Sequence, residues 1–356
     1  MLTVPAHTRT YWATALVLAV LAVLWPLLGE SDLSLVGVGL GYAVAAVGVD
    51  IATGYAGQPN FGQSAFMAIG AYAAAWLENS QGLSLWQASL CAIILCALLA
   101  TLLGLAAVRL EHLGFGIVTF AFAFVAAAFL QGGALSDITG GPNGTPSPAG
   151  SLFGYDVTQP RTLYGVALVV LIVATFLSHN FVRSRAGRAM LTVKGNEKVA
   201  AVLGVDATSV KLRAFALSAA FGGAGGVLIA ISAGFVTPAS FPPAASVTLF
   251  GMVALGGVGT ITGPILGAMF FWLVPSYAPG LEAKQTVFIA AVFLLVLVVL
   301  PSGVFGTVAD LVARRRPKLR WARPLGPARG QPARDVRGDD RLARVGERRG
   351  RVNVNE

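Results

Sequence analysis

Charged residues are scarce in this chain. They make up 12% of its 356 residues, whereas about 25% is usual for a soluble domain. Hydrophobic residues account for 56%, and the mean hydropathy of the chain is +0.74. A composition this apolar excludes a soluble globular protein and predicts an all-α polytopic membrane protein. The 43 glycines agree with this, because glycine lets membrane helices approach closely.

Residues that carry catalysis or bind metals are also few. Cys91 and Cys96 lie five residues apart on one apolar segment and therefore on different helix faces, so we expect them to pack and not to form a disulfide or metal pair. His7, His112 and His179 are scattered, and none has metal-ligand spacing to another ligand residue. No phosphate-binding G-x-x-x-x-G-K-[ST] loop occurs. We expect no enzymatic activity, no metal and no cofactor in this chain.

The excess of basic residues is confined to the C-terminal tail. Up to Asp310 the chain carries 11 basic and 11 acidic residues, which cancel. From Arg314 onward it carries 14 basic and five acidic residues, which accounts for the net charge of +9. We predict that residues 1–312 form the membrane domain and that residues 313–356 form a disordered basic cytoplasmic tail. Contact of the tail with anionic lipid and a merely solvated tail both remain open, and the second is favoured.

Long apolar runs predict about 8–10 transmembrane segments, since a helix needs roughly 20 residues to span the hydrocarbon core. Because the first run lacks an A-x-A cleavage site and further spans follow it directly, we expect no cleaved leader. The predicted spans are residues 11–28, 33–53, 60–77, 84–108, 113–131, 162–180, 212–233 and 285–300, with a broken apolar segment at 244–275.

The orientation follows from a basic island at residues 183–213. It holds seven of the 11 basic residues that precede the tail, and short loops rich in Lys and Arg stay in the cytoplasm. We therefore predict a cytoplasmic loop at 181–213 and an external loop at 132–161. With Arg9 also inside, both termini are expected in the cytoplasm.

Two segments are interrupted by glycine and proline. For the tail to end inside, residues 244–275 must cross twice or not at all. Their centre, GGVGTITGP (256–264), cannot continue as a helix, which predicts two half-helices or a re-entrant hairpin. A counterpart, GYAGQPNFGQSAFMAIGAY, occupies residues 54–72. Paired interrupted segments in the two halves of a chain point to the mid-membrane site of a transporter.

Polar groups in these segments are candidates for a substrate pathway. The amides of Gln58, Asn60 and Gln63 could bind a zwitterion or hold helices together, and both readings stay open. A half-helix N-terminus near Gly62 could offer N–H donors to a carboxylate. Two interpretations of Asp50 stay open. It takes part in gating or in the pathway, or its carboxylate is simply satisfied by water or by a local hydrogen bond. The candidate pathway residues are Asp50, Gly57, Gln58, Asn60, Phe61, Gly62, Gln63, Gly256, Gly257, Gly259 and Gly263.

Two loops also carry local signals. The stretch GNEKVAAVLGV (195–205) predicts a short helix with Asn196 as N-cap and Gly204 as its stop. We expect Ala200, Ala201 and Leu203 to form a small apolar knob, which would enter a cleft of a cytosolic partner or lie on lipid. In the external loop, DITGGPNGTPSP (137–148) predicts tight turns. That loop would dock a delivering protein, close the outer mouth, or simply connect two helices.

Five sequence stretches together resemble the permease of bacterial branched-chain amino-acid ABC transporters, in particular its LivM-like membrane subunit. The resemblance covers about residues 33–306. The stretches are GYAGQPNFGQSAF (54–66), TGGPNGT (139–145), SRAGRA with NEKVAAVLGV and KLRAFALSAAFGGAGG (within 184–226), MVALGGVGTITGPILGA (252–268) and PSGVFG (301–306).

The resemblance implies an inverted-repeat importer core in the inner membrane that moves leucine, isoleucine or valine by alternating access. It implies a second, LivH-type permease, two cytosolic ABC ATPase subunits that use the ATP, and an extracytoplasmic solute-binding protein. By the same resemblance, the residues that couple to the ATPase are Arg185, Gly187, Arg188, Glu197, Ala200, Ala201 and Gly204. The matching external-loop residues are Thr139, Gly140, Gly141, Asn143 and Gly144.

The chain departs from the family pattern beside the expected pathway. Asp50 stands where a neutral residue is more usual, and Pro59-Asn60 replaces a Leu-Ser pair. A urea or short-chain amide permease of the same architecture is therefore an alternative. A polytopic membrane enzyme would need clustered His, Asp or Glu residues, and an ion-coupled carrier would depend on Asp50 alone.

Overall fold

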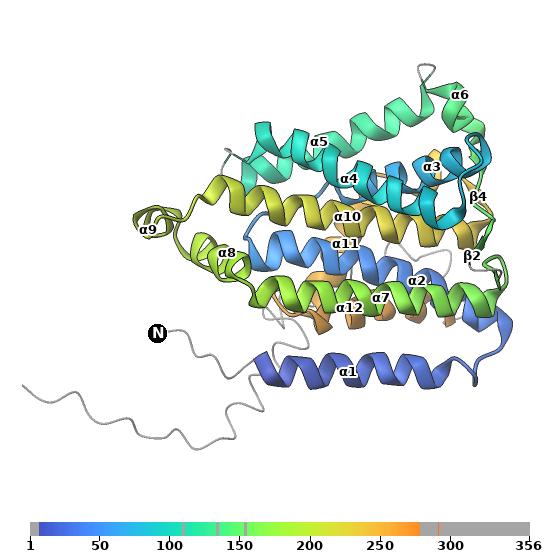
Figure 1. Cartoon of the computed structure of the whole chain (residues 1–356), viewed down its shortest axis with the longest axis horizontal. Coiled ribbons are helices and arrows are strands. Elements are labelled where there is room, and N and C mark those ends of the chain that lie inside the picture. Colours follow the sequence, from blue (N-terminus) through green and yellow to red (C-terminus); the bar gives the residue numbers. More distant parts are fainter. Residues whose placement is uncertain are drawn as a thin grey trace, which may run out of the picture. The chain divides into compact units, whose positions relative to one another are not determined.

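The computed structural model describes residues 7–108, 110, 112–132, 135–152, 155–277 and 291. This part of the chain is almost entirely helical (Figure 1). The helices are α1 (His7–Leu24), α2 (Glu30–Asp50), α3 (Gln63–Asn79), α4 (Leu85–Ala107), α5 (His112–Gln131), α6 (Ser136–Thr139), α7 (Pro160–Arg183), α8 (Arg185–Gly195), α9 (Glu197–Val202), α10 (Ala207–Ala233), α11 (Ala244–Gly256) and α12 (Thr262–Tyr277).

Shorter elements connect these helices. A π-helical turn, η2 (Ile51–Tyr55), extends α2, and two 3-10 turns are η3 (Gly141–Asn143) and η4 (Pro238–Ser240). Four two-residue strands form two small antiparallel sheets, in which β1 pairs with β4 and β2 with β3. These strands are β1 (Thr145–Pro146), β2 (Ser151–Leu152), β3 (Tyr155–Asp156) and β4 (Phe235–Val236).

The centre of the bundle is formed by α2 and α10. In their most apolar stretches 83% and 78% of the residues are buried, against 28% in α4 and 33% in α5. Small residues let the central helices approach: a methyl group placed at Gly70 of α3 would lie 2.5 Å from the Gly223 Cα of α10. Helices that pack backbone to backbone in this way are typical of membrane proteins.

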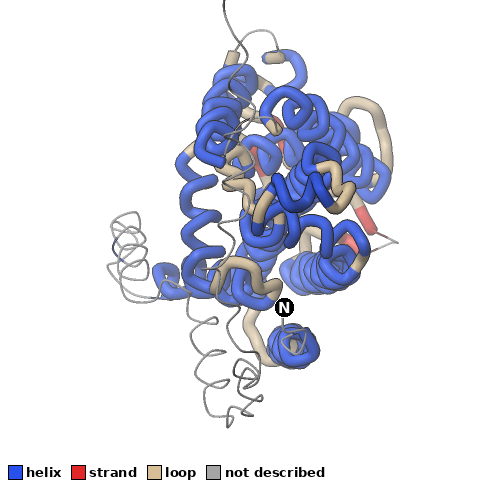
Figure 2. The backbone as a smooth tube through the Cα atoms, turned by 90° about the vertical axis from the view of Figure 1, so that its left-hand side faces the viewer, coloured by secondary structure: helices blue, strands red, loops and turns tan. Residues whose placement is uncertain are grey.

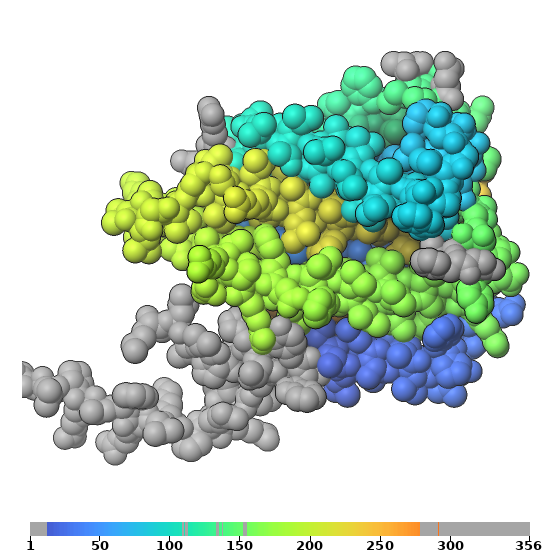
Figure 3. All heavy atoms as spheres, viewed as in Figure 1, coloured from blue at the N-terminus to red at the C-terminus, as the bar shows by residue number. Residues whose placement is uncertain are grey.

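The outer helices present apolar side chains away from the bundle. Large apolar residues such as Leu102 of α4 and Leu113 of α5 are 66% and 76% exposed. In Figure 3, α4 and α7 cover much of the visible face, and α10 is seen between them. Figure 2 looks along the bundle and shows α1 at its edge. Lipid or another protein chain must cover such large exposed apolar surfaces.

Six helices among the described residues are long and apolar enough to cross a membrane. This confirms the predicted all-α polytopic fold. The number lies below the predicted 8–10 because α3 and α12 have only 17 and 16 residues. The apolar part of α1 is also short, Ala13–Leu24. Apart from residue 291, the predicted span at 285–300 lies outside the described residues, as do the PSGVFG motif and the basic tail.

The broken segment at 244–275 folds as two helices, α11 and α12, joined by a turn at residues 257–261. The backbones of Gly256 and Gly263 touch where the helices leave the turn. Together with η4, α11 makes up Pro238–Gly256, which is one of the six segments long and apolar enough to cross a membrane, whereas α12 has only 16 residues. The prediction that glycine and proline interrupt this segment is confirmed.

Helix α12 runs antiparallel to α2 along most of its length. The Gly259 amide donates to Asp50 at the end of α2 over 2.6 Å, and the Trp272 indole donates to the Leu35 carbonyl over 2.8 Å. At the start of α2, the Tyr277 hydroxyl donates to Asp32. These contacts hold the turn between α11 and α12 against the far end of α2.

Candidate functional site

The helix that begins as α2 does not continue into α3. Its last turn widens into η2, and residues 56–62 then run without regular structure to the start of α3. Thr53 ties this loop together, because its hydroxyl donates to the backbone carbonyl of Gln58 and accepts from the backbone N–H of Asn60. The interruption predicted at the beginning of the segment 54–72 is therefore present and internally bonded.

Asn60 and Gln63 form a buried network with Ser218 of α10. The side-chain Nδ2 of Asn60 donates to Gln63 Oε1 over 2.8 Å and to Ser218 Oγ over 3.1 Å. The side-chain Nε2 of Gln63 donates to the backbone carbonyls of Ala45 and Ser218. Asn60 and Gln63 are both 0% exposed. Since both side-chain amides are used within the protein, this arrangement favours a role in holding α2, α3 and α10 together.

Three backbone N–H groups around the start of α3 are also occupied. The Gly62 amide donates to Asn60 Oδ1 over 2.9 Å, and the Ser64 amide donates to Ser246 Oγ of α11 over 2.9 Å. The Phe61 amide donates to the Thr119 hydroxyl. The half-helix terminus that could have received a carboxylate thus binds oxygen atoms of the protein itself.

The two interrupted segments meet in space. Gly54 of η2 lies against Gly259 in the turn before α12, so that a methyl group on Gly54 would lie 2.6 Å from the Gly259 nitrogen. The rings of Phe61 and Phe250 are 5.1 Å apart. Gly257 and Gly259 have φ values of 120° and 81°, which the turn requires. The structure therefore brings both predicted groups of pathway residues to one place.

Some polar atoms at this junction have no partner among the described residues. These are both side-chain atoms of Gln58 and Oδ2 of Asp50. Each of the two side chains is 1% exposed. An unpaired buried polar group costs roughly 1–3 kcal/mol. A bound polar solute could offset that cost, so Gln58 and Asp50 are the pathway residues with free binding capacity.

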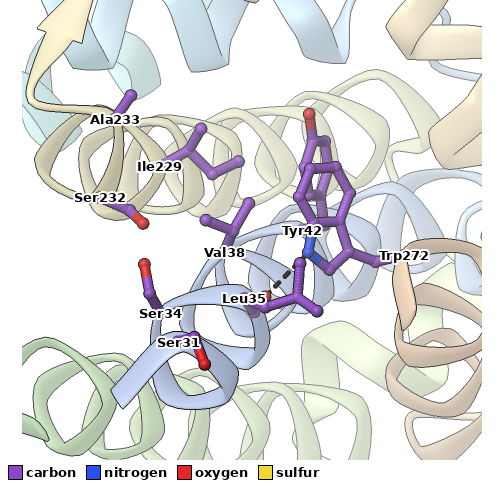
Figure 4. A pocket seen from close by; sticks show the side chains of 9 residues that line it. All are labelled: Ser31, Ser34, Leu35, Val38, Tyr42, Ile229, Ser232, Ala233 and Trp272. Atoms are coloured by element: carbon purple, nitrogen blue, oxygen red, sulfur yellow. Dashed lines mark hydrogen bonds between the residues drawn. The ribbon is translucent and has the colours of Figure 1, made fainter. Parts of the chain in front are cut away.

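A separate pocket of about 400 Å³ lies between α2, α10 and α12 (Figure 4). Serine hydroxyls and the tilted ring pair of Tyr42 and Trp272, 4.9 Å apart, line it. None of the predicted pathway residues belongs to it. Apolar periodicity alone could not single out Tyr42 and Trp272, because both sit on otherwise apolar helices. The lining residues are Ser31, Ser34, Leu35, Val38, Tyr42, Ile229, Ser232, Ala233 and Trp272.

The basic island folds as α8 and α9. Asn196 caps α9, since its Oδ1 accepts from the amides of Lys198 and Val199 over 2.9 and 3.2 Å. The chain leaves α9 at Gly204, which has a φ of 74°. The predicted N-cap and stop are both confirmed. Figure 1 shows α8 and α9 together at one end of the bundle, opposite α6 and the β-strands.

The apolar face of α9 agrees with the predicted knob at Ala201 and Leu203 but differs from it at Ala200. Ala200 is 0% exposed and faces inward, whereas Val199, Val202 and Leu203 are 51%, 88% and 67% exposed. These three positions share one side of a helix because they are three and four residues apart. Ala201 is exposed as well. The available surface is therefore built from Val199, Val202 and Leu203, which we call the α9 face.

The charged residues of the island anchor it. Glu197 forms an ion pair of 2.5 Å with Lys211 of α10. Arg185 and Arg188 are exposed, and Arg188 donates to the Arg183 carbonyl. Gly187 is buried, touches the Val182 carbonyl, and donates its amide to the capping hydroxyl of Ser184 over 3.3 Å.

Lys194 of α8 was not among the predicted site residues. Its Nζ donates to the Gly54 carbonyl in η2. A methyl group on Gly57 would lie 3.1 Å from Lys194 Cγ, so the side chain passes closely over the loop after η2. The only sequence signal for this residue was a basic charge in the last turn of a helix, which does not identify a partner.

The external loop is held by turns and by β1. The Thr139 side chain is buried, donates to the Leu130 carbonyl over 3.0 Å and accepts from the Gly141 amide. Gly140, Gly141 and Gly144 all have positive φ, and Asn143 is exposed. The predicted tight turns are confirmed. Pairing of β1 with β4 ties this loop to the end of α10.

Cys91, Cys96 and His179 lie on three of the helices. Cys96 is buried and donates to the Phe66 carbonyl, and Cys91 is exposed, with both thiols free. His179 of α7 lies 3.4 Å from the Thr14 hydroxyl of α1. Within the described part of the chain, no three His, Cys, Asp or Glu side chains gather as a metal site would require.

Most of the chain is similar to a known protein family. Residues 33–300 match the family described as branched-chain amino acid transport system / permease component. The chain belongs to this family. The matched region of this permease runs from the first turn of α2 to beyond the end of α12, and it includes both interrupted segments and the basic island. The predicted resemblance is therefore confirmed.

Named relatives agree with the family. The high-affinity branched-chain amino acid transport system permease protein LivM of Salmonella typhimurium is 29% identical, over 89% of this chain and 78% of the relative. BraD of Pseudomonas aeruginosa, a permease protein of such a system, is 25% identical, over 76% of this chain and 92% of its own. LivH of Escherichia coli K12 is 30% identical over 41% of this chain and 48% of its own. No solved structure matches. The chain is a multi-pass transport permease component.

Proposed function

We propose that this permease is the membrane-spanning subunit of an ATP-driven importer for leucine, isoleucine and valine in a bacterial inner membrane. The family match over residues 33–300 carries the proposal. The substrate follows from relatives whose names specify branched-chain amino acids. The subunit would work by alternating access, exposing its pathway to one side of the membrane at a time.

The α9 face supports coupling to a cytosolic ATPase. It exposes Val202 and Leu203 at the end of the bundle, where uncovered apolar groups favour association with a partner. The ion pair between Glu197 and Lys211 fixes the short helix to α10. A push on α9 would therefore reach α10 directly. In this proposal two ABC ATPase subunits hydrolyse the ATP, and both termini lie on their side of the membrane.

The junction of the two interrupted segments supports the placement of the substrate pathway. Gln58 offers an unpaired amide, and Asp50 offers an unpaired carboxylate oxygen. An amide can bind the carboxylate of an amino acid, and a carboxylate can bind its ammonium group. Asn60 and Gln63, with Gly62 and Phe61, would support this junction without contacting the solute. The glycines at 256, 257, 259 and 263 would shape its other side.

The remaining surfaces suit the other proposed partners. A second, LivH-type permease would cover part of the apolar exterior, because similarity to LivH as well as LivM supports pairing of related chains. The external loop, whose turns contain Thr139 and Gly144, would receive a solute-binding protein. A urea or short-chain amide importer is the second candidate, because the unpaired amide of Gln58 suits an amide solute equally well.

Reconstitution tests the proposal. The permease would be purified with its second permease and ATPase subunits and placed in proteoliposomes with the solute-binding protein outside. We expect ATP-dependent accumulation of radiolabelled leucine, isoleucine and valine, and none with a non-hydrolysable ATP analogue. Accumulation of urea alone would select the second candidate. Uphill accumulation by this chain without any ATPase would contradict both.

A further inference from the structure

The Gly54 carbonyl lacks the hydrogen bond that a regular helix would give it. The residue four positions later is Gln58, and its backbone N–H donates to the Ala52 carbonyl instead, over 2.8 Å. The residue five positions on is Pro59, which has no N–H. The π-helical turn therefore leaves a buried carbonyl that needs an outside donor.

Lys194 supplies that donor from the cytoplasmic loop. Its Nζ donates to the Gly54 carbonyl, and the main chain of α8 approaches so closely that a methyl group on Gly57 would lie 3.7 Å from Lys194 Cα. Lys194 is an exposed residue whose apolar stem passes over Gly57 and whose charge lies at the far end of that stem. This side chain joins α8, which directly precedes α9, to the end of α2.

On its other side, Gly54 borders the turn between α11 and α12. A methyl group on Gly54 would lie 2.9 Å from Asp50 Cγ, so Gly54 sits directly beside the carboxylate. Asp50 in turn accepts from the Gly259 amide over 2.6 Å. Three segments distant in sequence thus meet around one glycine.

We propose that Lys194 is a positioning residue that transmits movement of α8 to Gly54 and, through Asp50, to the turn that begins α12. The inference rests on the proposed coupling to ATP hydrolysis. It gives the cytoplasmic loop a second connection to the membrane segments, separate from the ion pair of Glu197 with Lys211. When the ATPases shift α8 and α9, the Lys194 side chain carries that shift to the junction where the interrupted segments meet.

The test uses the full reconstituted complex and compares ATPase activity with and without solute-loaded binding protein. Lys194→Met should lower the stimulation about 2- to 30-fold, the range expected when a coupling network is damaged. Basal ATPase activity should remain, because α9 still docks. Lys194→Arg should restore stimulation, since it keeps a charged donor. Arg213→Met, which removes an exposed cation of α10 in the same loop, should behave as wild type.

The Asp50 part of the path has its own test. If Asp50 and Lys194 act in series, the variant carrying both Asp50→Asn and Lys194→Met should lose no more stimulation than the worse single variant. Losses that multiply would overturn this part. Normal stimulation in a fully assembled Lys194→Met complex would overturn the whole inference. A wild-type complex without any stimulation would instead reject the proposed function.

Discussion

Glu197 and Lys211 pair across 2.5 Å, although Lys211 is almost fully buried and Glu197 is 45% exposed. The pair gives the short α9 a fixed position against α10. It also provides the partner that a buried ammonium needs, because an unpaired buried charge is strongly destabilising.

Glu197→Lys would place two cations opposite each other. We expect it to abolish stimulation of ATPase activity by loaded binding protein while the permease still inserts into the membrane. Glu197→Gln, which keeps a hydrogen-bonding group, should retain part of the stimulation. ATPase assays on reconstituted complexes measure the effect, and wild-type stimulation in Glu197→Lys would count against coupling through α9.

Gly204 ends α9 with a φ of 74°, and no atom lies within 4 Å of a methyl group placed on it. A bulky replacement would therefore act through the backbone, at a cost of about 1–2 kcal/mol for the left-handed conformation. We expect Gly204→Leu to abolish stimulated ATPase activity and to spare insertion. Gly204→Asn should be milder, because asparagine tolerates this conformation. Equal, normal activity in both variants would show that the end of α9 need not be fixed.

Val202 is 88% exposed, so a polar residue there should not disturb folding. If the α9 face binds an ATPase, Val202→Asp should weaken co-purification of the ATPase with the permease. Thr208→Asp serves as the matched control, because it adds the same charge at an exposed position outside the α9 face and outside the predicted coupling residues. Undiminished co-purification of the Val202→Asp variant would mean that the ATPase binds elsewhere.

Gly70 and Gly223 bring the backbones of α3 and α10 into contact, with a methyl group on Gly70 only 2.6 Å from the Gly223 carbonyl oxygen. Gly70→Val should lower the thermal unfolding midpoint of the solubilised permease, because overpacking typically costs about 1–3 kcal/mol. Gly195→Ala is the control, since nothing lies within 4 Å of its added methyl group. Equal midpoints for the two variants would be inconsistent with the tight α3–α10 contact.

The basic tail offers a simple deletion. Removing residues 314–356 should leave solute uptake nearly intact, because the predicted membrane domain ends before it. Uptake rates normalised to the amount of permease in the membrane measure the effect. A severe loss in a normally expressed truncation would assign the tail a role in transport.

Local signals in the sequence predicted local structure well. Asn196 and Gly204 delimit α9 as expected, because caps and stops depend on nearby backbone groups. The interruptions at 54–62 and 256–264 were likewise predictable, since glycine and proline act at their own positions.

Relations between distant segments were not predictable in the same way. The inward face of α9 depends on how the helix docks on α10, and for this reason Ala200 is buried although it was expected in the exposed apolar knob. Nothing local in the sequence could show that Lys194 reaches Gly54, which lies 140 residues earlier. The amides of Asn60 and Gln63 look equally suited to solute and to protein until Ser218 is placed beside them.

The close contact of α3 with α10 limits where a solute could pass through the helix bundle. At Gly70 and Gly223, and again where Gly226 touches the Met67 backbone, the two helices leave no gap that even one methyl group could enter. A leucine molecule therefore cannot thread between them. A pathway for a solute of that size has to run past this tightly packed pair of helices, along other helices or a neighbouring chain.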